Sequence, residues 1–248
     1  MKSFLAALQF LTIIPVKVKS LDERTLSRGV MYFPVVGFIL GLILSGIDYA
    51  LHSINFNPIL SSTLLVIALI VITGGMHLDG VADTADGFFS GKTRDEKLKI
   101  MRDPSTGAMG AISLISIIIL KIALIYSIIP DSRAIALILM LVLSRWAMVF
   151  CMYIFPYART DGKANVFING MKQNTLIIAT LTAIALVLFV KGMPGVILII
   201  EIALVTALFG KWAVKKIGGI TGDTLGALAE LSEIAVLLIF YIIQRGVL

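Results

Sequence analysis

The sequence predicts an all-α protein, a polytopic bundle of about seven transmembrane helices preceded by an N-terminal interfacial helix. Hydrophobic residues make up 58% of the 248 residues, charged residues only 15%, and the mean hydropathy is +1.01. These values lie far from those of soluble globular domains. Several apolar runs also reach the length of about 20 residues that crosses a bilayer. We therefore expect a single integral-membrane domain over residues 1–248.

The chain begins with a short amphipathic segment. Phe4, Leu8 and Leu11 recur at helical spacing, and Pro15 closes the run. A lysine followed by a short apolar stretch resembles a signal peptide, but no small-residue cleavage site follows it. A helix that lies on the cytoplasmic face of the membrane is the better interpretation.

Apolar runs after this helix predict seven spans. The second span should continue past the bilayer as a helix that carries a row of aspartates. A short amphipathic piece around Leu98 and Met101 should then lie on the membrane surface. The expected spans are residues 30–51, 59–78, 107–129, 133–155, 175–190, 195–214 and 224–244.

Lysine and arginine are distributed very unevenly among the connecting segments. Because cytoplasmic loops carry an excess of these residues, the crowded side should face the cytoplasm. We expect a multi-pass protein of the cytoplasmic (inner) membrane whose chemistry takes place on that side. The net charge of +6 then reflects the lipid bilayer as partner and no nucleic acid. The crowded side holds Lys2, Lys17, Lys19, Arg24, Arg28, Lys92, Arg94, Lys97, Lys99, Arg102, Arg159, Lys163, Lys172, Lys211, Lys215 and Lys216; the other side holds Arg133, Lys191 and Arg245.

Three aspartates stand at helical spacing in the segment from Thr73 to Gly91. Asp79, Asp83 and Asp86 follow an i, i+4, i+7 pattern, which places their carboxylates on one face of a helix. Like charges at this spacing destabilise a bare helix. Mg²⁺ binds oxygen ligands and bridges to substrate phosphates, so it would neutralise them. We predict that the three aspartates hold Mg²⁺; a solvated helix edge is the alternative.

Small residues lie to one side of this acidic face. They are Gly80, Thr84, Gly87 and Gly91. Such a stripe lets a second helix approach closely within a membrane. We therefore expect a tight helix contact beside the aspartates.

A second acidic row follows the expected sixth span. Asp223 stands among glycines in the segment GGITGDTLGA, and Glu230 and Glu233 continue the row into the last span. Glycines let the backbone approach a phosphate or a neighbouring helix. Successive caps of two helices are an equally good interpretation of the same glycines.

Three further polar residues lie within the apolar segments. Ionisable residues inside a membrane are costly and are candidates for function. Arg145 has no neutralising neighbour in its own helix, so it should face the acidic cluster. Lys121 should snorkel toward the surface or pair with Glu201. His77 stands two residues before Asp79, which turns it away from the acidic face, so a core or interface histidine is expected.

Several motifs taken together resemble adenosylcobinamide-GDP ribazoletransferase, a family also called cobalamin (5′-phosphate) synthase. These motifs follow one another along nearly the whole chain, and their combination is specific although each one alone is short. They are FLAALQFLTIIPV, the SRG…FPVVG segment from Ser27 to Gly37, HLDGVADTADG, MRDPSTGAMG, YARTDG with Asn165-Val166-Phe167 after it, and GGITGDTLGA.

The resemblance implies an enzyme of cobalamin biosynthesis in the cytoplasmic membrane. It would join adenosylcobinamide-GDP to α-ribazole or α-ribazole 5′-phosphate, release GMP and require Mg²⁺. The three aspartates would hold the metal. Asp223 or His77 would accept the proton of the ribose hydroxyl. Docking of other enzymes of the pathway and an oligomeric state stay open.

Substrate contacts follow from the same resemblance. The family usually carries basic residues where this chain has Ile13 and Ser105, so Arg102 or Arg159 would supply those phosphate contacts instead. The expected substrate-binding residues are Arg102, Asp103, Arg145, Arg159, Asn165, Thr221 and Glu230.

Two other functional classes stay open. Asp83-x-x-Asp86-Gly87 is similar to the opening of the motif of CDP-alcohol phosphotransferases, which transfer lipid headgroups, although the rest of that motif is absent. An ion-coupled transporter would instead place its acidic residues at the bilayer midplane with access to both faces. Here the acidic residues gather at one side.

Overall fold

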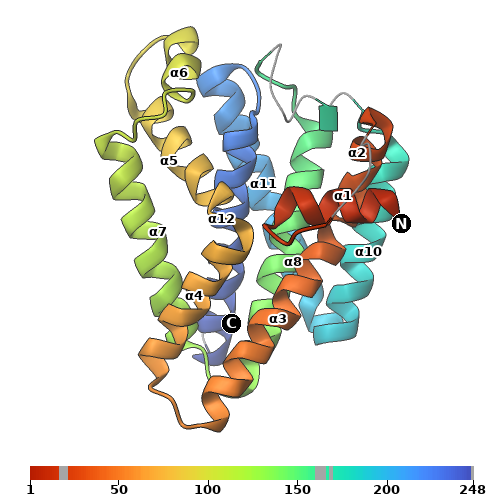
Figure 1. Ribbon diagram of the computed structural model, residues 1–248, viewed down its shortest axis with the longest axis vertical. Coiled ribbons are helices and arrows are strands. Elements are labelled where there is room, and N and C mark those ends of the chain that lie inside the picture. The colour runs from red at the N-terminus through yellow and green to blue at the C-terminus, as the bar shows by residue number, and fades with distance from the viewer. Residues whose placement is uncertain (17–21, 160–165, 168–169, 247–248) are drawn as a thin grey trace.

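The computed structural model is a bundle of α-helices, which confirms the predicted fold class (Figure 1). It describes residues 1–16, 22–159, 166–167 and 170–246. Within these ranges the elements are α1 (Lys2–Leu11), α2 (Glu23–Gly29), η1 (Val30–Tyr32), α3 (Phe33–Ser53), α4 (Pro58–Thr73), α5 (Met76–Phe89), α6 (Arg94–Ile100), α7 (Ala108–Ser127), α8 (Pro130–Ile154), α10 (Gln173–Lys191), η2 (Met193–Gly195), α11 (Val196–Ile217) and α12 (Gly222–Gln244). Six helical segments are long and apolar enough to cross a membrane, or seven if the bent pair of α4 and α5 counts as one span.

Helix α8 forms the centre of the bundle. Of its apolar stretch 83% is buried, compared with 22% for α7 and for α10. Helix α3 packs along it through Gly41, where an added Cβ would lie 2.5 Å from the Cα of Ile138. The missing side chain lets the two backbones approach closely, as is common between membrane helices.

The second expected span does not continue straight into the aspartate helix. Helix α4 ends at Thr73, and α5 leaves it at an angle of 90°. Gly74 and Gly75 form the corner with φ angles of +64° and +68°, a left-handed conformation that is costly for other residues. The prediction of one continuous helix was therefore wrong, because two consecutive glycines permit a sharp corner that hydropathy does not reveal.

Helix α1 lies crosswise to the long helices (Figure 1). Ala6, Ala7 and Leu11 are its buried residues. Its C-terminal end is tied to the end of α4, since the Ile13 N–H donates to the Ile72 carbonyl oxygen at 2.8 Å. The expected N-terminal helix is present, and its place on a membrane surface stays a prediction.

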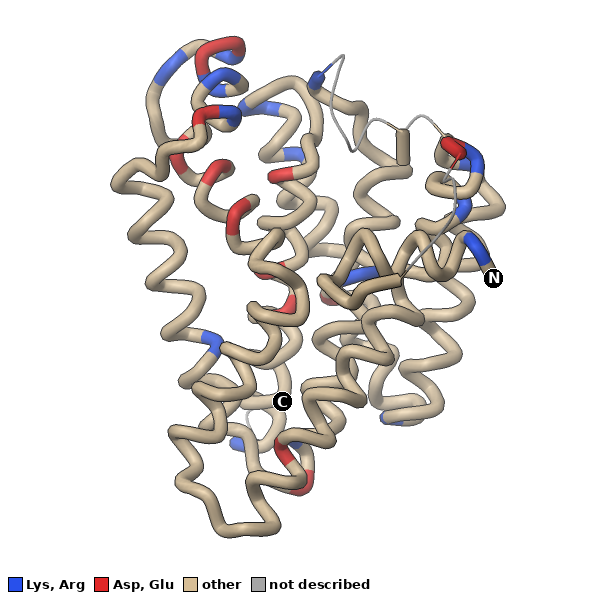
Figure 2. The backbone as a smooth tube through the Cα atoms, in the orientation of Figure 1, with Lys and Arg blue, Asp and Glu red and all other residues tan. Residues whose placement is uncertain are grey.

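Charged residues gather toward the end of the bundle where α5 ends and α6 lies, which we call the α6 end (Figure 2). This end carries the connections between α5 and α7 and between α11 and α12. The opposite end, where α3 ends and α4 begins, carries few charges (Figure 2). Lys17, Lys19 and Lys163 lie outside the described residues.

Candidate active site

A cavity of about 290 Å³ lies between the start of α5, the start of α12 and the far part of α8. Its polar side brings together three predicted site residues, His77, Asp79 and Asp223. Its remaining wall is mostly apolar and comes from α1, α3, α5, α8, α12 and the segment before α10. The apolar side chains are Phe10, Phe33, Met76, Met148, Met152, Phe167 and Leu225.

Two glycines hold the acidic helices together at this cavity. An added Cβ on Gly80 of α5 would lie 2.5 Å from the carbonyl oxygen of Asp223, and one on Gly226 of α12 would lie 3.2 Å from the Cα of His77. The two backbones therefore cross in direct contact, which places Asp79 beside Asp223. The tight helix contact predicted for the small residues is confirmed at Gly80. Gly91 does not belong to it, because it has a φ of +70° and its added Cβ would meet nothing within 4 Å.

Replacing Gly80 by alanine should force α5 and α12 apart. Overpacking of this kind costs about 1–3 kcal/mol, so the midpoint of thermal unfolding should fall. Gly46 of α3 is the matched control, because an added Cβ there meets nothing within 4 Å. Equal midpoints for Gly80→Ala and Gly46→Ala, measured in the same detergent, would contradict this close contact.

Asp83 lies at the middle of the aspartate row and is partly buried. Three negative charges act on it, those of Asp79, Asp223 and Asp86, against one positive charge, that of Arg159. Repulsion in a partly buried site is costly, because solvent screens it less completely than at a fully exposed surface. The row therefore favours binding of a cation.

Asp86 has a structural partner that the sequence did not indicate. Its two carboxylate oxygens accept hydrogen bonds from the backbone N–H groups of Gly107 at 2.7 Å and Gly110 at 2.8 Å. Those N–H groups belong to the first turn of α7, which otherwise lacks a side-chain cap. An added Cβ on either glycine would collide with the carboxylate. Asp86 thus caps α7, and its role as a metal ligand stays a prediction.

Truncation of Asp86 to alanine should destabilise the protein by about 0.5–2 kcal/mol, the usual cost of losing a helix cap. Asp86→Asn keeps one carbonyl oxygen as acceptor, so its loss should be smaller. Unfolding midpoints of the two variants measure the difference. If both variants unfold like the unmodified protein, Asp86 contributes nothing as a cap.

Asp223 is held in place by neighbours on both sides. Its Oδ2 atom accepts a hydrogen bond from Nη2 of Arg159 at 2.8 Å and one from the Thr221 hydroxyl at 3.3 Å. Thr221 is fully buried and caps α12, because its Oγ1 accepts the N–H of Thr224 at 3.2 Å. Gly218 ends α11 with a φ of +79°, so this segment does contain the two successive caps, while Gly226 serves the close approach of a neighbouring helix. Thr221 positions Asp223, and a direct contact of Thr221 with substrate stays a prediction.

A short backbone pairing brings Arg159 to Asp223. The N–H of Ala158 donates to the Ile220 carbonyl, and the N–H of Ile220 donates to the Pro156 carbonyl, both at 2.8 Å. The segments after α8 and before α12 therefore run side by side at the α6 end. The contact between Arg159 and Asp223 joins residues 64 positions apart in the chain, so sequence spacing does not reveal it.

A second, more open pocket of about 350 Å³ lies beside α6 at the same end. Basic side chains dominate it, namely those of Arg94, Lys99, Arg102 and Arg159. Arg159 lines this pocket and also pairs with Asp223, so it links the basic pocket to the acidic cavity. Arginine and lysine in such a pocket suit phosphate groups.

Two other predicted substrate contacts lie away from the cavity lining or outside the described chain. Asp103 is exposed, and hydrogen bonds from the hydroxyl and N–H of Ser105 lower the pKa of its carboxyl group. It is therefore a charged acceptor that is already engaged in a local turn. Asn165 lies outside the described residues.

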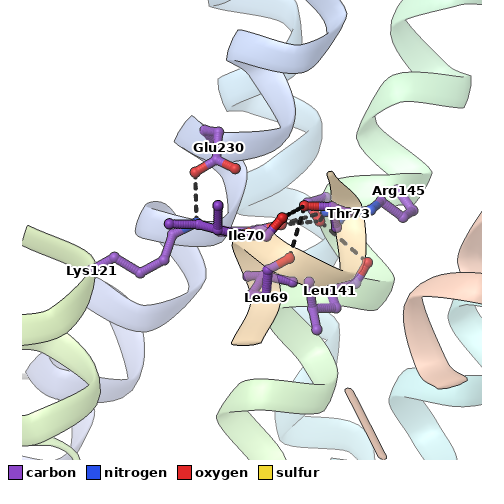
Figure 3. Close-up of polar contacts among 9 residues, drawn as sticks. Leu69, Ile70, Thr73, Lys121, Leu141, Arg145 and Glu230 are labelled. Carbon is purple, nitrogen blue, oxygen red and sulfur yellow. Dashed lines mark hydrogen bonds and ion pairs between the residues drawn. The ribbon is translucent and has the colours of Figure 1, made fainter. Parts of the chain in front are cut away.

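A second acidic group is buried among the long helices (Figure 3). Nζ of Lys121 on α7 lies 2.6 Å from an oxygen of Glu230 and 2.6 Å from an oxygen of Glu233, both on α12. Arg145 of α8 contacts the other oxygen of Glu233 and the Ser144 hydroxyl. Figure 3 shows Lys121 and Arg145 entering from opposite sides. Two cations therefore neutralise two buried carboxylates, as a low-dielectric interior requires.

These pairings revise the expectations for the intramembrane charges. Arg145 does face an acidic cluster, through Glu233. Lys121 was expected to snorkel or to pair with Glu201, and that was wrong, because Glu230 and Glu233 bind it instead. Arg145 and Glu230, predicted as substrate contacts, belong to this ion-pair network and not to the cavity lining.

His77 lies between the network and the cavity. It is 2% exposed, as expected for a core histidine, and its Nε2 atom has no hydrogen-bond partner. One of its ring nitrogens and oxygens of Glu230 and Glu233 lie within 4.8 Å of one another, the one such group of three in the described ranges. Lys121 and Arg145 already neutralise both glutamates, so a metal ion there would meet repulsion. We interpret this group as structural.

The apolar wall of the cavity was missed in the sequence. One pattern in the sequence could have indicated it. Phe10 does not lie on the helix face formed by Phe4, Leu8 and Leu11, so the packing of that face does not account for its aromatic ring. Phe167 follows the YARTDG motif and carried no separate interpretation. Aromatic residues from distant segments signal a common wall only when their packing is known.

A membrane bundle with an acidic cavity that adjoins a basic pocket has the groups that an integral-membrane transferase acting on phosphate-bearing substrates would need. A family model described as Cobalamin-5-phosphate synthase matches residues 3–241. The chain therefore belongs to the cobalamin-5-phosphate synthase family, whose members are transferases of cobalamin biosynthesis.

Similar curated proteins agree with this assignment. An adenosylcobinamide-GDP ribazoletransferase from Desulforamulus reducens is 40% identical over 239 residues, which cover 96% of each chain. Proteins of the same name from Roseiflexus sp. and Fusobacterium nucleatum are 38% and 36% identical, covering 93% and 98% of this chain and 86% and 98% of their own. No solved structure matches the fold.

Proposed function

We propose that this protein joins adenosylcobinamide-GDP to α-ribazole or α-ribazole 5′-phosphate and releases GMP, with Mg²⁺ as cofactor. The observation that carries the proposal is the meeting of Asp79 and Asp223 in one cavity, next to an arginine that leads to a basic pocket. The names of the similar proteins supply the substrates. The same cavity and basic pocket would also suit a lipid-headgroup transferase, and the names of the similar proteins favour the ribazole reaction over it. Transport is less well supported, because the acidic cavity and the basic pocket adjoin each other and lead to one end of the bundle.

The residues at the site fit Mg²⁺. This ion takes oxygen ligands and is commonly bound through one or two carboxylates together with substrate phosphates. Asp79 and Asp83 lie one turn apart on α5, and the charges around Asp83 are mainly negative. When bound, Mg²⁺ would neutralise charge on the diphosphate oxygens. We assign Asp79 and Asp83 as its main ligands, with Asp86 as the third.

The described side chains have separate tasks in this transfer. The ribose oxygen of the acceptor forms a bond to the phosphorus that carries the corrinoid, and the bond from that phosphorus to GMP breaks. Arg159, Arg102 and the basic pocket would hold the non-bridging oxygens of the diphosphate. The hydroxyl proton would pass to Asp223, which Arg159 and Thr221 hold at the cavity, or to the unpartnered nitrogen of His77.

Release of GMP tests the proposal directly. The purified protein in detergent should release GMP from adenosylcobinamide-GDP only when α-ribazole or its phosphate is present, and chelation of Mg²⁺ should abolish release. Reactions without acceptor control for hydrolysis, and CDP-diacylglycerol with an alcohol controls for the lipid-headgroup reaction. No acceptor-dependent GMP in the presence of Mg²⁺ would refute the proposal.

We also propose that the α6 end faces the cytoplasm of an inner-membrane protein. The single cysteine, Cys151, is free and buried, so an engineered cysteine can be labelled without background. Lys92→Cys at the α6 end should react with an impermeant maleimide only in opened cells, whereas Ser53→Cys at the opposite end should react in intact cells. The reverse pattern would invert the proposed orientation.

A further inference from the structure

We propose that the apolar wall of the 290 Å³ cavity is the binding site for the aromatic base of the acceptor nucleoside, whose sugar then faces Asp79 and Asp223. This inference rests on the proposed function and adds a specificity-determining surface to it. The cavity is acidic at one side and aromatic at the other. A nucleoside has the matching division, with a hydroxyl-bearing sugar at one end and a flat heterocycle at the other.

Three phenyl rings form the centre of this wall. The ring centroids of Phe10 and Phe33 lie 5.9 Å apart with planes inclined by 16°, and those of Phe10 and Phe167 lie 4.4 Å apart. The rings come from α1, from α3 and from the segment before α10. At these distances the rings pack against one another and form one continuous aromatic surface. A flat heterocycle can stack on the side of such a surface that faces the cavity.

Flexible thioethers complete the apolar surface. Met148 and Met152 come from the far part of α8, one turn apart, and are 3% and 4% exposed. Methionine adapts to irregular shapes and makes favourable contacts with aromatic rings. The wall can therefore close around a planar ligand.

The volume of the cavity limits which ligands can fit in it. Its volume of about 290 Å³ is near the lower end of the range of about 300–1,000 Å³ for sites that hold small molecules. A single nucleoside suits that space, whereas a corrinoid macrocycle needs far more. The donor substrate must then lie mainly outside, toward the basic pocket.

The charges on the lining also select the ligand. No lysine or arginine is among the described lining residues of this cavity, so a phosphate group is better placed toward Arg159. Phenyl groups offer no conventional hydrogen bond to exocyclic amino or carbonyl groups of a base, and thioether sulfur is only a weak acceptor. Burial of such groups without partners is costly, so the wall should favour a base without them.

Helix α1 is fixed in position to serve this role. The Ile13 N–H bond to the Ile72 carbonyl anchors its C-terminal end beside the corner between α4 and α5. Phe10 stands three residues earlier and faces the cavity. The crosswise helix thus forms part of the site, and its aromatic residue is accessible to a ligand because it is only partly buried.

Steady-state kinetics with Phe10 variants test the proposal. Phe10→Ala should raise KM for α-ribazole by about tenfold or more, the usual scale for losing one stacked ring. KM for adenosylcobinamide-GDP should stay unchanged, and Phe10→Tyr should restore the acceptor KM. Phe189→Ala is the matched control, because that ring lies on α10 and is 82% exposed. An unchanged acceptor KM, or equal rises in both KM values, would overturn the proposal.

A binding measurement separates this inference from the proposed reaction. Equilibrium dialysis with α-ribazole, free benzimidazole and adenosine needs no turnover. The unmodified protein should bind the first two more tightly than adenosine, and Phe10→Ala should lose that preference. If no GMP is released but this preference is found, the proposed reaction is refuted and the proposed base-binding site is supported. If GMP is released and adenosine binds equally well, the base site is wrong.

Discussion

Replacing Asp83 by asparagine should lower the turnover number by at least about 100-fold while the protein stays folded, because metal-held charge neutralisation is worth several kcal/mol in phosphoryl transfer. Asparagine keeps the shape of the side chain and removes its charge. Asp79→Asn should behave similarly. GMP release measured over a range of Mg²⁺ concentrations gives the turnover number and the apparent metal affinity. Asp131→Asn is the control, since this exposed aspartate lies in the first turn of α8 at the opposite end.

The same variant, Asp83→Asn, should be more stable than the unmodified protein in the absence of metal, although its turnover is lower. Asp83 is repelled by three carboxylates, so without metal its neutralisation should raise the unfolding midpoint. In the unmodified protein Mg²⁺ should raise that midpoint by binding the folded state, and Asp83→Asn should respond less. Near-normal turnover of both asparagine variants at limiting Mg²⁺ would show that these aspartates do not hold the metal.

Removing Lys121 should destabilise the bundle by about 3–5 kcal/mol, the scale observed when one partner of a buried ion pair is deleted. Lys121→Met leaves two buried glutamates, Glu230 and Glu233, opposite the single charge of Arg145. Methionine retains the apolar stem, so the lost charge accounts for most of the effect. Thermal unfolding in one detergent measures the change.

A double variant isolates the electrostatic cause. Lys121→Met combined with Glu230→Gln leaves one cation, Arg145, with one carboxylate, Glu233, and should recover much of the lost stability. Lys191→Met, on the last turn of α10, controls for loss of a lysine near the bundle surface. A double variant no more stable than Lys121→Met alone would show that neutralisation of Glu230 is not the role of Lys121.

Hydropathy predicted most of the fold because membrane spans are selected by length and polarity along the chain. The expected span 133–155 corresponds to α8 (Pro130–Ile154), and 224–244 to α12 (Gly222–Gln244). The corner between α4 and α5 was missed, since Gly74 and Gly75 are apolar enough for a span and yet adopt left-handed backbone angles. Backbone conformation of this kind follows from local packing and not from hydropathy.

Only part of the candidate site was predicted from the sequence, for a related reason. The spacing of Asp79 and Asp83 on one helix face is a local property, and periodicity reveals it. The pairing of Lys121 with Glu230 depends on how far each helix is rotated and how deep it lies, which no periodicity records. The same holds for Arg159 and Asp223, which a backbone pairing between two loops brings together.

The sequence by itself determined a helical membrane protein with a carboxylate-bearing helix at one end. The length of apolar runs, the helical spacing of residues and short motifs are local properties that can be recognised directly in the order of residues. Only the tertiary structure decided which charges meet, which aspartate caps a helix, and which aromatic rings line the cavity. Those choices depend on the close approach of α5 and α12 at Gly80 and Gly226 and on the crosswise position of α1. Contacts between distant segments arise from packing in three dimensions, where neighbours in space are not neighbours in sequence.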